Sequence, residues 1–199
     1  MRENIYFCRM IDKEIIILGG ANGSGKTTFA NAFLELYSEY IFINADEIAK
    51  NLNPQNLESV RLTAGKDFFK ILHETIAAKN KIIIESTLAG KYLSRFISEF
   101  KKNRFKVTLI YIYLDSSEMC IKRIKERVLK GGHNIPSIDI LRRYDRSLKN
   151  FWGIYKDSVD EWILVYNSEN KFEEVAFGIK NDFSTINIDD FNKFYKKIK

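Results

Sequence analysis

The chain has 199 residues, of which 45% are hydrophobic and 29% are charged, which is typical of one soluble globular domain. Only two prolines and no low-complexity run exclude a disordered or collagen-like chain. The longest apolar runs fall far short of the roughly 20 residues that a membrane-spanning helix needs. The N-terminus scatters charges where a secretory signal would be apolar, so we expect a cytoplasmic protein without a membrane partner.

The net charge of +6 is concentrated in the middle of the chain. Residues 91–150 carry 15 Lys and Arg against 6 Asp and Glu, whereas the segments before and after are slightly acidic. This pattern predicts a local anionic partner, such as a nucleotide, a sugar phosphate or a nucleic acid backbone. Cys8 and Cys120 are too few for a disulfide framework and are interpreted as buried thiols.

Short apolar runs alternate with longer stretches of helical periodicity. Strands are predicted at 15–18, 41–43, 82–84, 107–114 and 162–165. Helices are predicted at 27–36, 57–78, 91–101 and 116–130, with a terminal helix at about 185–199. Because strands that are apolar on both faces alternate with helices, we expect an α/β fold with a five-stranded parallel sheet sandwiched by helices. No internal boundary divides residues 1–199, so the prediction is a single domain.

The motif that carries the chemistry follows the first predicted strand. Its residues are Gly20, Ala21, Asn22, Gly23, Ser24, Gly25, Lys26 and Thr27, which fit G-x-x-x-x-G-K-[ST] at every constrained position. In this P-loop pattern the backbone N–H groups cradle phosphates, the Lys26 side chain reaches the β- and γ-phosphates, and the Thr27 hydroxyl ligates Mg²⁺. Thr28 stands where a dinucleotide fingerprint would need its third glycine. The sequence therefore predicts a P-loop NTPase fold; the alternative is a glycine-rich turn that binds no nucleotide.

Two acidic residues follow the next two predicted strands. Asp46 comes after the second strand and Glu85 after the third, and the carboxyl ends of parallel strands border the ligand crevice. A carboxylate there can take a proton from an acceptor hydroxyl or hold the waters of a metal ion. Two alternatives stay open: Asp46 caps the helix that follows it, and Glu85 only pairs with a cation.

The basic segment contains two predicted helices joined by a glycine-rich turn. Arg123 and Arg127 lie four residues apart on the first helix. The second helix carries Arg142, Arg143 and Arg146. Such a hairpin is a candidate lid, about residues 123–146, that closes over a triphosphate. The alternative is a solvated basic hairpin, and His133 in the turn is either a surface residue or part of the site.

The chain resembles the zeta-toxin-like kinases, a branch of the P-loop small-molecule kinases. The resemblance rests on GGANGSGKTT at 19–28, INADEIAKNLNP at 43–54, IIIESTLAG at 82–90, RVLKGGHNIPSIDILRRYDRS at 127–147 and YNS at 166–168. It spans about residues 14–180, and its Gly-Gly-His-x-Ile-Pro lid is similar to that of a short chromosomal subgroup. The founding toxins of this family phosphorylate the 3′-hydroxyl of UDP-N-acetylglucosamine from ATP and are inhibited by an antitoxin.

The resemblance implies ATP and Mg²⁺ as cofactors, a small-molecule acceptor and an antitoxin partner. The roles that it implies are Asp46, Lys26, Arg127 and Arg142 in catalysis; residues 20–28, Arg123 and Asn167 around ATP; Asp46, Glu85, Thr87, His133 and Arg143 around the acceptor; and Thr27 at the metal. The individual roles of the lid arginines stay open.

Three functions are compatible with these residues. The leading hypothesis is a kinase for a hydroxyl of a small molecule, with UDP-N-acetylglucosamine as the acceptor that the resemblance suggests. A nucleoside or polynucleotide-end kinase is the second, although few aromatic side chains interleave the basic ones as stacking platforms. The third is a nucleotide-dependent switch that binds a partner, but Asp46 suits an acceptor hydroxyl better than a switch loop.

Overall fold

The computed structural model describes residues 13–53, 56–132, 134–168, 171–179 and 182–199. The strands are β1 (Glu14–Gly19), β2 (Ile41–Ile43), β3 (Lys81–Ser86), β4 (Lys106–Tyr113), β5 (Glu161–Ser168), β6 (Lys171–Ile179) and β7 (Asp182–Thr185). They form one seven-stranded sheet in the order β2-β3-β1-β4-β5-β6-β7. The first five strands are parallel, as the sequence predicts, whereas β6 and β7 are antiparallel additions.

The prediction of five strands therefore missed β6 and β7. Along β6 the side chains of Glu173 and Glu174 are exposed, and all four residues of β7 are exposed. Neither segment has the continuous apolar run that marks a strand covered on both faces. The two strands extend the sheet beyond β5 and leave the order of the parallel strands unchanged.

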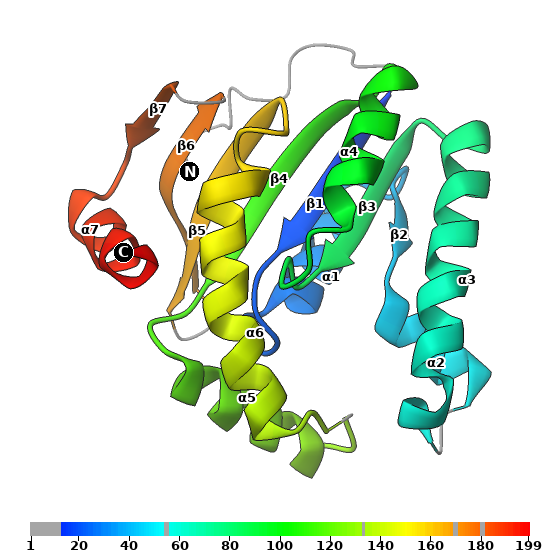
Figure 1. The fold of residues 1–199 in the computed structure, drawn as a ribbon, viewed down its shortest axis with the longest axis horizontal. Helices are drawn as coiled ribbons and strands as arrows, with labels where there is room; N and C mark the ends of the chain where they lie inside the picture. The colour runs from blue at the N-terminus through cyan, green and yellow to red at the C-terminus, as the bar shows by residue number, and fades with distance from the viewer. Residues whose placement is uncertain (1–12, 54–55, 133, 169–170, 180–181) are drawn as a thin grey trace.

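The helices lie unequally on the two faces of the sheet (Figure 1). They are α1 (Lys26–Leu36), α2 (Ala45–Leu52), α3 (Leu57–Ala78), α4 (Leu93–Lys102), α5 (Ser117–Leu129), α6 (Ser137–Asn150) and α7 (Ile188–Ile198), with a π-helical turn at Phe151–Tyr155. Helices α3, α4, α6 and α7 lie over one face, and α1 lies behind the sheet. Within the described ranges, no helix combines the length and the apolar character needed to cross a membrane.

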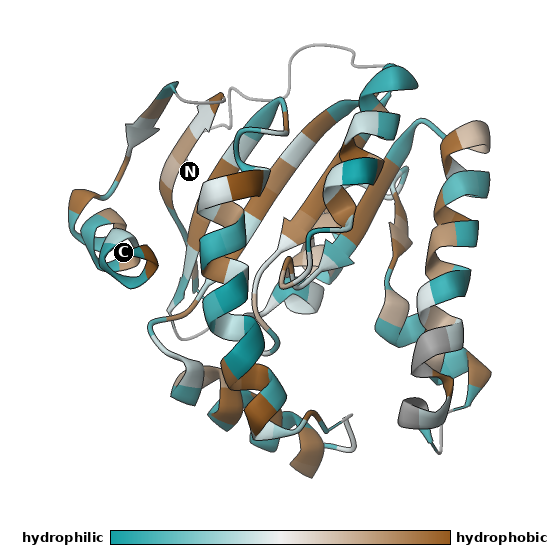
Figure 2. Ribbon diagram, in the orientation of Figure 1, coloured by the Kyte–Doolittle hydropathy of each residue, from teal (hydrophilic) through white to brown (hydrophobic). Residues whose placement is uncertain are grey.

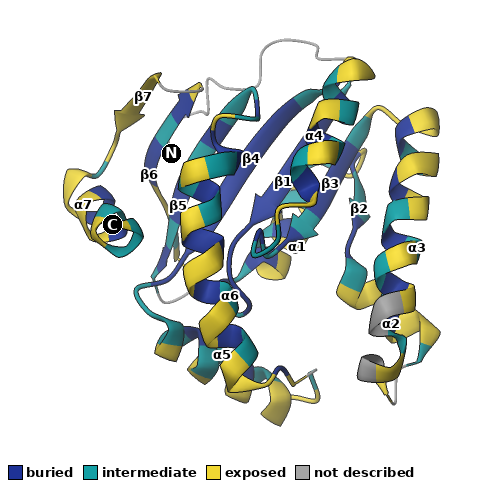
Figure 3. Ribbon diagram, viewed as in Figure 1, coloured by how far each residue is buried: buried dark blue, intermediate teal, exposed yellow. Residues whose placement is uncertain are grey.

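The central strand β1 shows how the sequence builds two cores. Ile15 and Ile17 belong to the core under α3, α4 and α6, and Ile16 and Leu18 belong to the smaller core under α1. All four are at most 2% exposed. Figure 2 shows the strands of the sheet centre as mostly hydrophobic, and Figure 3 shows them as mostly buried. Because side chains pack against both faces of β1, the loop that follows β1 begins at a rigidly held position.

The predicted C-terminal helix is confirmed as α7, which packs against α6 and β6. Its Phe194 is fully buried, with its ring centroid 5.2 Å from that of Tyr113, 5.8 Å from Phe151 and 5.9 Å from Trp152. Aromatic clusters of this kind contribute beyond simple area burial. Helix α7 therefore packs over the part of the sheet that β6 and β7 extend.

Candidate active site

The predicted P-loop lies between β1 and α1, as its motif requires. Gly20 has φ 145° and Gly25 has φ 100°, conformations that side-chain-bearing residues rarely adopt. A Cβ atom at Gly20 would lie 2.2 Å from the carbonyl oxygen of Ile112, and one at Gly25 would lie 2.3 Å from Nδ2 of Asn167. The loop therefore needs glycine at both positions to follow its path.

The groups around the loop fit a phosphate chain. Gly25 begins α1 without a side-chain cap, so the first amide groups of the helix are left for a ligand. Ser24 is fully buried, and its Oγ has no hydrogen-bond partner among the described residues. Lys26 is only 4% exposed, and its Nζ donates to the carbonyl oxygen of Ala21 at 3.0 Å. The buried ammonium group of Lys26, the uncapped amide groups of α1 and the hydroxyl of Ser24 can together bind the phosphate oxygens of a nucleotide.

Glu85, at the end of β3, contacts both functional side chains of the loop. Its Oε2 accepts a hydrogen bond from Thr27 Oγ1 at 2.8 Å and another from Asn44 Nδ2 at 2.9 Å, while Oε1 lies 3.5 Å from Lys26 Nζ. Glu85 thus lies beside a cation and also accepts two hydrogen bonds from uncharged side chains. A hydroxyl and a carboxylate side by side are also the oxygen ligands that Mg²⁺ prefers.

Asp46 is not the cap of the helix that follows β2, so that alternative was wrong. The cap of α2 is Asn44, whose side chain accepts a hydrogen bond from the backbone N–H of Asp46 at 2.8 Å. The signal for this role was present in the sequence, since Asn before an Asp-Glu pair is a common start of a helix. With the cap supplied by Asn44, the carboxylate of Asp46 is exposed in the first turn of α2.

A cavity of about 440 Å³ at the carboxyl ends of the parallel strands brings together seven of the predicted site residues. Those that line it are Asn22, Lys26, Asp46, Glu85, Thr87, Arg142 and Arg143. Arg146 of the predicted lid also lines it, as do residues without an earlier site role, among them Asn44 and Tyr92. One concave site thus combines an ammonium, carboxylates and guanidinium groups, which is the arrangement expected of a phosphate-transfer site.

The arginines of the predicted lid differ in their contacts. Arg143 Nη1 donates to Asn22 Oδ1 at 3.2 Å, which links α6 directly to the P-loop. Arg142 Nη2 lies 2.6 Å from Asp139 Oδ1, within its own helix. Arg127 is half-buried on α5, with its carbonyl oxygen accepting from the N–H of Gly132 at 2.9 Å, and it does not line the cavity. His133 lies outside the described residues.

The P-loop also contacts the end of β5, through Ser24 and Asn167. Nδ2 of Asn167, which is fully buried, donates to the carbonyl oxygen of Ser24 at 2.7 Å. Arg123 Nη2 donates to the carbonyl oxygen of Asn167 at 3.3 Å. Among the described residues, Asn167 Oδ1 and Arg123 Nη1 are buried without a hydrogen-bond partner. Thr28 is exposed in the first turn of α1. These groups border the loop where the sequence analysis expects ATP.

A mostly parallel sheet, a P-loop after its first strand and acidic residues after the next two strands together define a P-loop kinase. The chain belongs to the zeta toxin family, whose family model matches residues 3–174. An uncharacterized protein of Haemophilus influenzae is 33% identical over 135 residues, which are 68% of this chain and 95% of that protein.

Two solved structures share the fold. The crystal structure of the AvrRxo1-ORF1:AvrRxo1-ORF2 complex with ATP contains a chain that aligns with a TM-score of 0.73 and 19% identity over 93% of this chain. The chain described here spans 64% of that longer chain. The structure of the PezAT chromosomal toxin-antitoxin system of Streptococcus pneumoniae aligns with a TM-score of 0.62 and 13% identity, over 94% of this chain and 86% of the other.

Proposed function

We propose that the protein transfers the γ-phosphoryl group of ATP to a hydroxyl group of a small molecule. The observation that carries this proposal is the shared cavity, in which Lys26, Asp46 and Arg143 line one space of about 440 Å³. A phosphoryl group held by Lys26 on the P-loop side would face an acceptor beside Asp46. Positioning and charge stabilisation account for most of the catalysis of such transfers.

In this mechanism each side chain has one task. Asp46 orients the acceptor hydroxyl and takes its proton as the oxygen attacks the γ-phosphorus, while the bond from that phosphorus to the β-phosphate oxygen breaks and ADP leaves. Lys26 and the arginines of α6 stabilise the charge on the transferred group. Thr27, held by Glu85, would bind Mg²⁺, which would supply charge neutralisation at the phosphates.

The hairpin of residues 123–146 is proposed as the lid of this site. Figure 1 shows α5 and the start of α6 beyond the carboxyl ends of the strands, next to the P-loop side of the sheet. Gly131 has φ 81°, which marks a turn between the two helices that a residue with a side chain would strain. Closure would bring the arginines of α6 nearer to the phosphates and exclude water from the reaction.

For the acceptor we propose a sugar nucleotide, with UDP-N-acetylglucosamine as the compound suggested by the resemblance to the founding toxins. The cavity volume lies at the lower end of the roughly 300–1,000 Å³ typical of small-molecule sites. Its lining is polar, since Asp46, Glu85 and Thr87 contribute to it together with three arginines of α6. These features favour a hydroxyl-rich, negatively charged acceptor.

We also propose an antitoxin as protein partner. This rests on membership of the zeta toxin family and on the structural likeness to PezAT, which is described as a toxin-antitoxin system. The test is co-expression with the product of any small open reading frame adjacent to the gene. A stable complex on gel filtration that suppresses turnover would support the proposal, and two proteins that elute separately with unchanged turnover would contradict it.

The decisive experiment on the activity itself measures ATP consumption with Mg²⁺ across sugar nucleotides, free sugars, nucleosides and 5′-hydroxyl oligonucleotides, with Lys26→Ala as the blank. Stimulation by one acceptor class identifies the substrate. An oligonucleotide reaction that weakens steeply with salt would favour the polynucleotide-end kinase, because phosphate-backbone binding depends on ionic strength. Slow hydrolysis that no acceptor stimulates would contradict the kinase proposal and favour a nucleotide-dependent switch.

A further inference from the structure

The β3–α4 loop, residues 87–92, forms one wall of the candidate active site. Its residues that line the 440 Å³ cavity are Thr87, Ala89, Gly90 and Tyr92. Leu88 does not line the cavity, since it is 1% exposed and belongs to the hydrophobic core. The loop has no regular secondary structure, and such segments are usually more mobile than the elements that they connect. Other contacts therefore have to fix this wall of the cavity.

The backbone of the loop turns at Leu88 in a conformation that its side chain disfavours. Leu88 has φ 55°, in the left-handed region that glycine adopts readily and that bulky residues rarely adopt. Its N–H donates to Ser86 Oγ at 3.2 Å. Its side chain packs so closely on the end of β1 that a Cβ atom at Gly19 would lie 2.6 Å from its Cδ1. A strained conformation of this kind persists only where the surrounding contacts determine it.

Two hydrogen bonds from the end of α6 and the turn after it hold carbonyl groups of the loop. Nδ2 of Asn150, the last residue of α6, donates to the carbonyl oxygen of Leu88 at 2.7 Å. The hydroxyl of Tyr155, which ends the π-helical turn, donates to the carbonyl oxygen of Gly90 at 2.6 Å. The two carbonyl groups stand before and after Ala89 in the chain. The loop is thus held on both sides of a residue that lines the cavity.

The side chain of Asn150 does more than end its own helix. An asparagine with only that role bonds locally, as Asn103 does at the end of α4, where its Nδ2 donates to the carbonyl oxygen of Glu99 at 2.9 Å. Asn150 instead reaches a residue 62 positions away in the chain. The backbone after it continues directly into the π-helical turn. The contact to the loop is therefore the specific feature of this side chain.

Helix α6 joins two walls of the site. Near its start Arg143 lines the cavity and donates to Asn22 of the P-loop at 3.2 Å, and at its end Asn150 holds the β3–α4 loop. The step from Arg143 to Asn150 spans about 10 Å of helix. A rigid helix of this length fixes the distance between the P-loop and the opposite wall. Phosphoryl transfer depends on such positioning, because a displacement of about 1 Å between reacting groups can cost a hundredfold in rate.

We propose that Asn150 is a positioning residue for the phosphoryl acceptor. Its hydrogen bond keeps Leu88 in the left-handed conformation, and this conformation sets Thr87 and Ala89 in the wall that the acceptor contacts. Asn150 does not itself line the cavity, so it acts through the loop and not on the substrate. The role rests on the proposed kinase function, because an acceptor has to bind in this cavity.

Asn150→Asp tests the role, since it keeps the size of the side chain and replaces the donating amide by a carboxylate that only accepts. The acceptor is the compound that the panel of candidate acceptors identifies. Its KM should rise about tenfold or more, because the carbonyl group of Leu88 loses its partner, while the KM for ATP stays within about twofold. Tyr155→Phe, which removes only the second hydrogen bond, should raise the acceptor KM by a smaller factor. Circular dichroism verifies that both variants fold.

Hydrogen–deuterium exchange tests the same contact without any substrate. In Asn150→Asp, the amides of peptides that cover residues 87–92 should exchange about tenfold faster than in the unmodified protein, because the loop opens more readily. Peptides that cover the P-loop, residues 20–27, should keep their rates. The comparison separates a local release of the loop from a general loss of stability.

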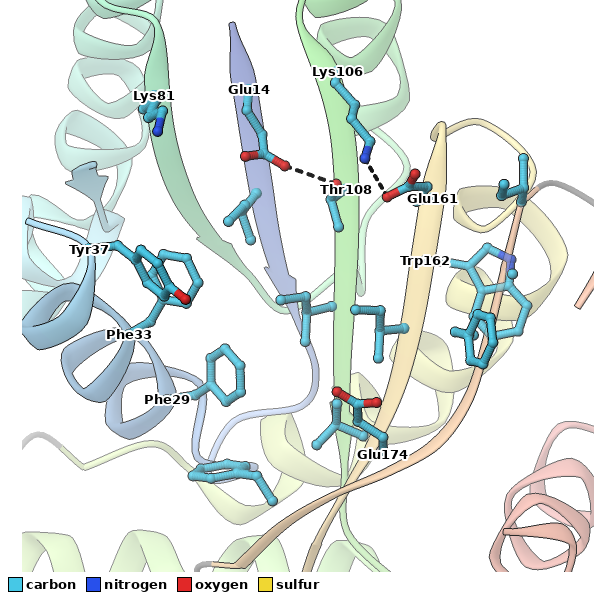
Figure 4. A pocket seen from close by; sticks show the side chains of 18 of the residues that line it. Glu14, Phe29, Phe33, Tyr37, Lys81, Lys106, Thr108, Glu161, Trp162 and Glu174 are labelled. Carbon is cyan, nitrogen blue, oxygen red and sulfur yellow. Dashed lines mark hydrogen bonds and ion pairs between the residues drawn. The ribbon is translucent and has the colours of Figure 1, made fainter. Parts of the chain in front are cut away.

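Two control variants remove a hydrogen bond elsewhere. Asn103→Ala removes the amide that donates to Glu99. Thr108→Val removes the hydroxyl that donates to Oε1 of the buried Glu14 at 3.4 Å (Figure 4). Thr108 lines a groove of about 1470 Å³ beside α1, which shares none of its lining residues with the cavity. Both variants should leave the acceptor KM and the exchange of residues 87–92 unchanged.

Three outcomes would overturn the proposal. The first is an acceptor KM that stays unchanged in both Asn150→Asp and Tyr155→Phe. The second is an equal rise of the KM for the acceptor and for ATP, or the same rise in Asn103→Ala, since Asn150 would then only support the fold. The third is unchanged exchange at residues 87–92. Turnover of the unmodified protein tests the proposed function, whereas exchange tests the contact without substrate, so the two failures are distinguished.

Discussion

The hydroxyl of Thr27 donates a hydrogen bond to Oε2 of Glu85 at 2.8 Å, although the two residues are 58 positions apart in the chain. The same carboxylate lies 3.5 Å from the ammonium group of Lys26. Glu85 therefore holds the two side chains of the P-loop that would contact Mg²⁺ and the phosphates. We expect its main effect on the reaction to pass through the metal and the nucleotide.

Glu85→Gln tests this expectation, since it keeps the shape of the side chain and removes its charge. The concentration of Mg²⁺ that gives half-maximal turnover should rise about tenfold or more, as is usual when a group that orients a metal ligand is changed. The measurement is a Mg²⁺ titration at saturating acceptor. Thr87→Val is the comparison in the same cavity, and it should raise the acceptor KM without changing the Mg²⁺ requirement. A raised acceptor KM with an unchanged Mg²⁺ requirement in Glu85→Gln would instead assign Glu85 to acceptor binding.

Asp46→Asn should abolish transfer while ATP still binds. A general base contributes roughly 10²–10⁴-fold to such a step, and the amide cannot take the proton. The binding of ATP, measured by calorimetry, should stay near the unmodified value. Glu47→Gln is the matched control, because Glu47 is the exposed neighbour of Asp46 and does not line the cavity. Full transfer by Asp46→Asn would rule out the base assignment.

Arg143→Ala should lower kcat by about a hundredfold, the usual loss when a donor to a developing charge is removed. The side chain is 17% exposed and donates a hydrogen bond to Asn22 of the P-loop, the loop that is proposed to hold the phosphates. Arg143→Lys should recover only part of the rate, because lysine lacks the planar fork of donors. Lys149→Ala on the same helix is the control, and an equal loss in that variant would indicate an unspecific effect on α6.

Phe194→Ala should destabilise the fold by about 3–5 kcal/mol, since it removes a fully buried aromatic ring from the cluster under α7. Urea denaturation measures the change in the free energy of unfolding. Ile188→Ala in the same helix removes a side chain that is 56% exposed, and such surface changes stay within about 0.5 kcal/mol. Similar losses in the two variants would mean that α7 does not depend on its buried face.

The parallel part of the sheet and the P-loop were predictable because their signals are local. A strand covered on both faces is a continuous apolar run, and a phosphate loop needs glycines at fixed spacing. The β6–β7 hairpin lacks such a run, since Glu173 and Glu174 are exposed in its first strand. The alternative that Asp46 caps the next helix was wrong because a residue two positions earlier, Asn44, supplies the cap.

Other parts of the site depend on contacts between residues that are far apart in the sequence, and no local sequence pattern predicts such contacts. Arg143 and Asn22 meet across 121 positions, so the sequence indicates a basic helix but not which arginine reaches the loop. The groove beside α1 was likewise not predicted. Periodicity identifies the apolar side of each strand, but the number of helices that cover each face follows only from the packed structure.

The antiparallel strands also change the position of β5 in the sheet. Without them β5 would be an edge strand, whereas here it pairs with β4 on one side and β6 on the other, and Asn167 is paired with Phe172. Its backbone amides should therefore exchange with deuterium at a rate set by unfolding of the whole sheet. The end of β5, which contacts the P-loop through Asn167, should therefore be among the last parts of the fold to exchange.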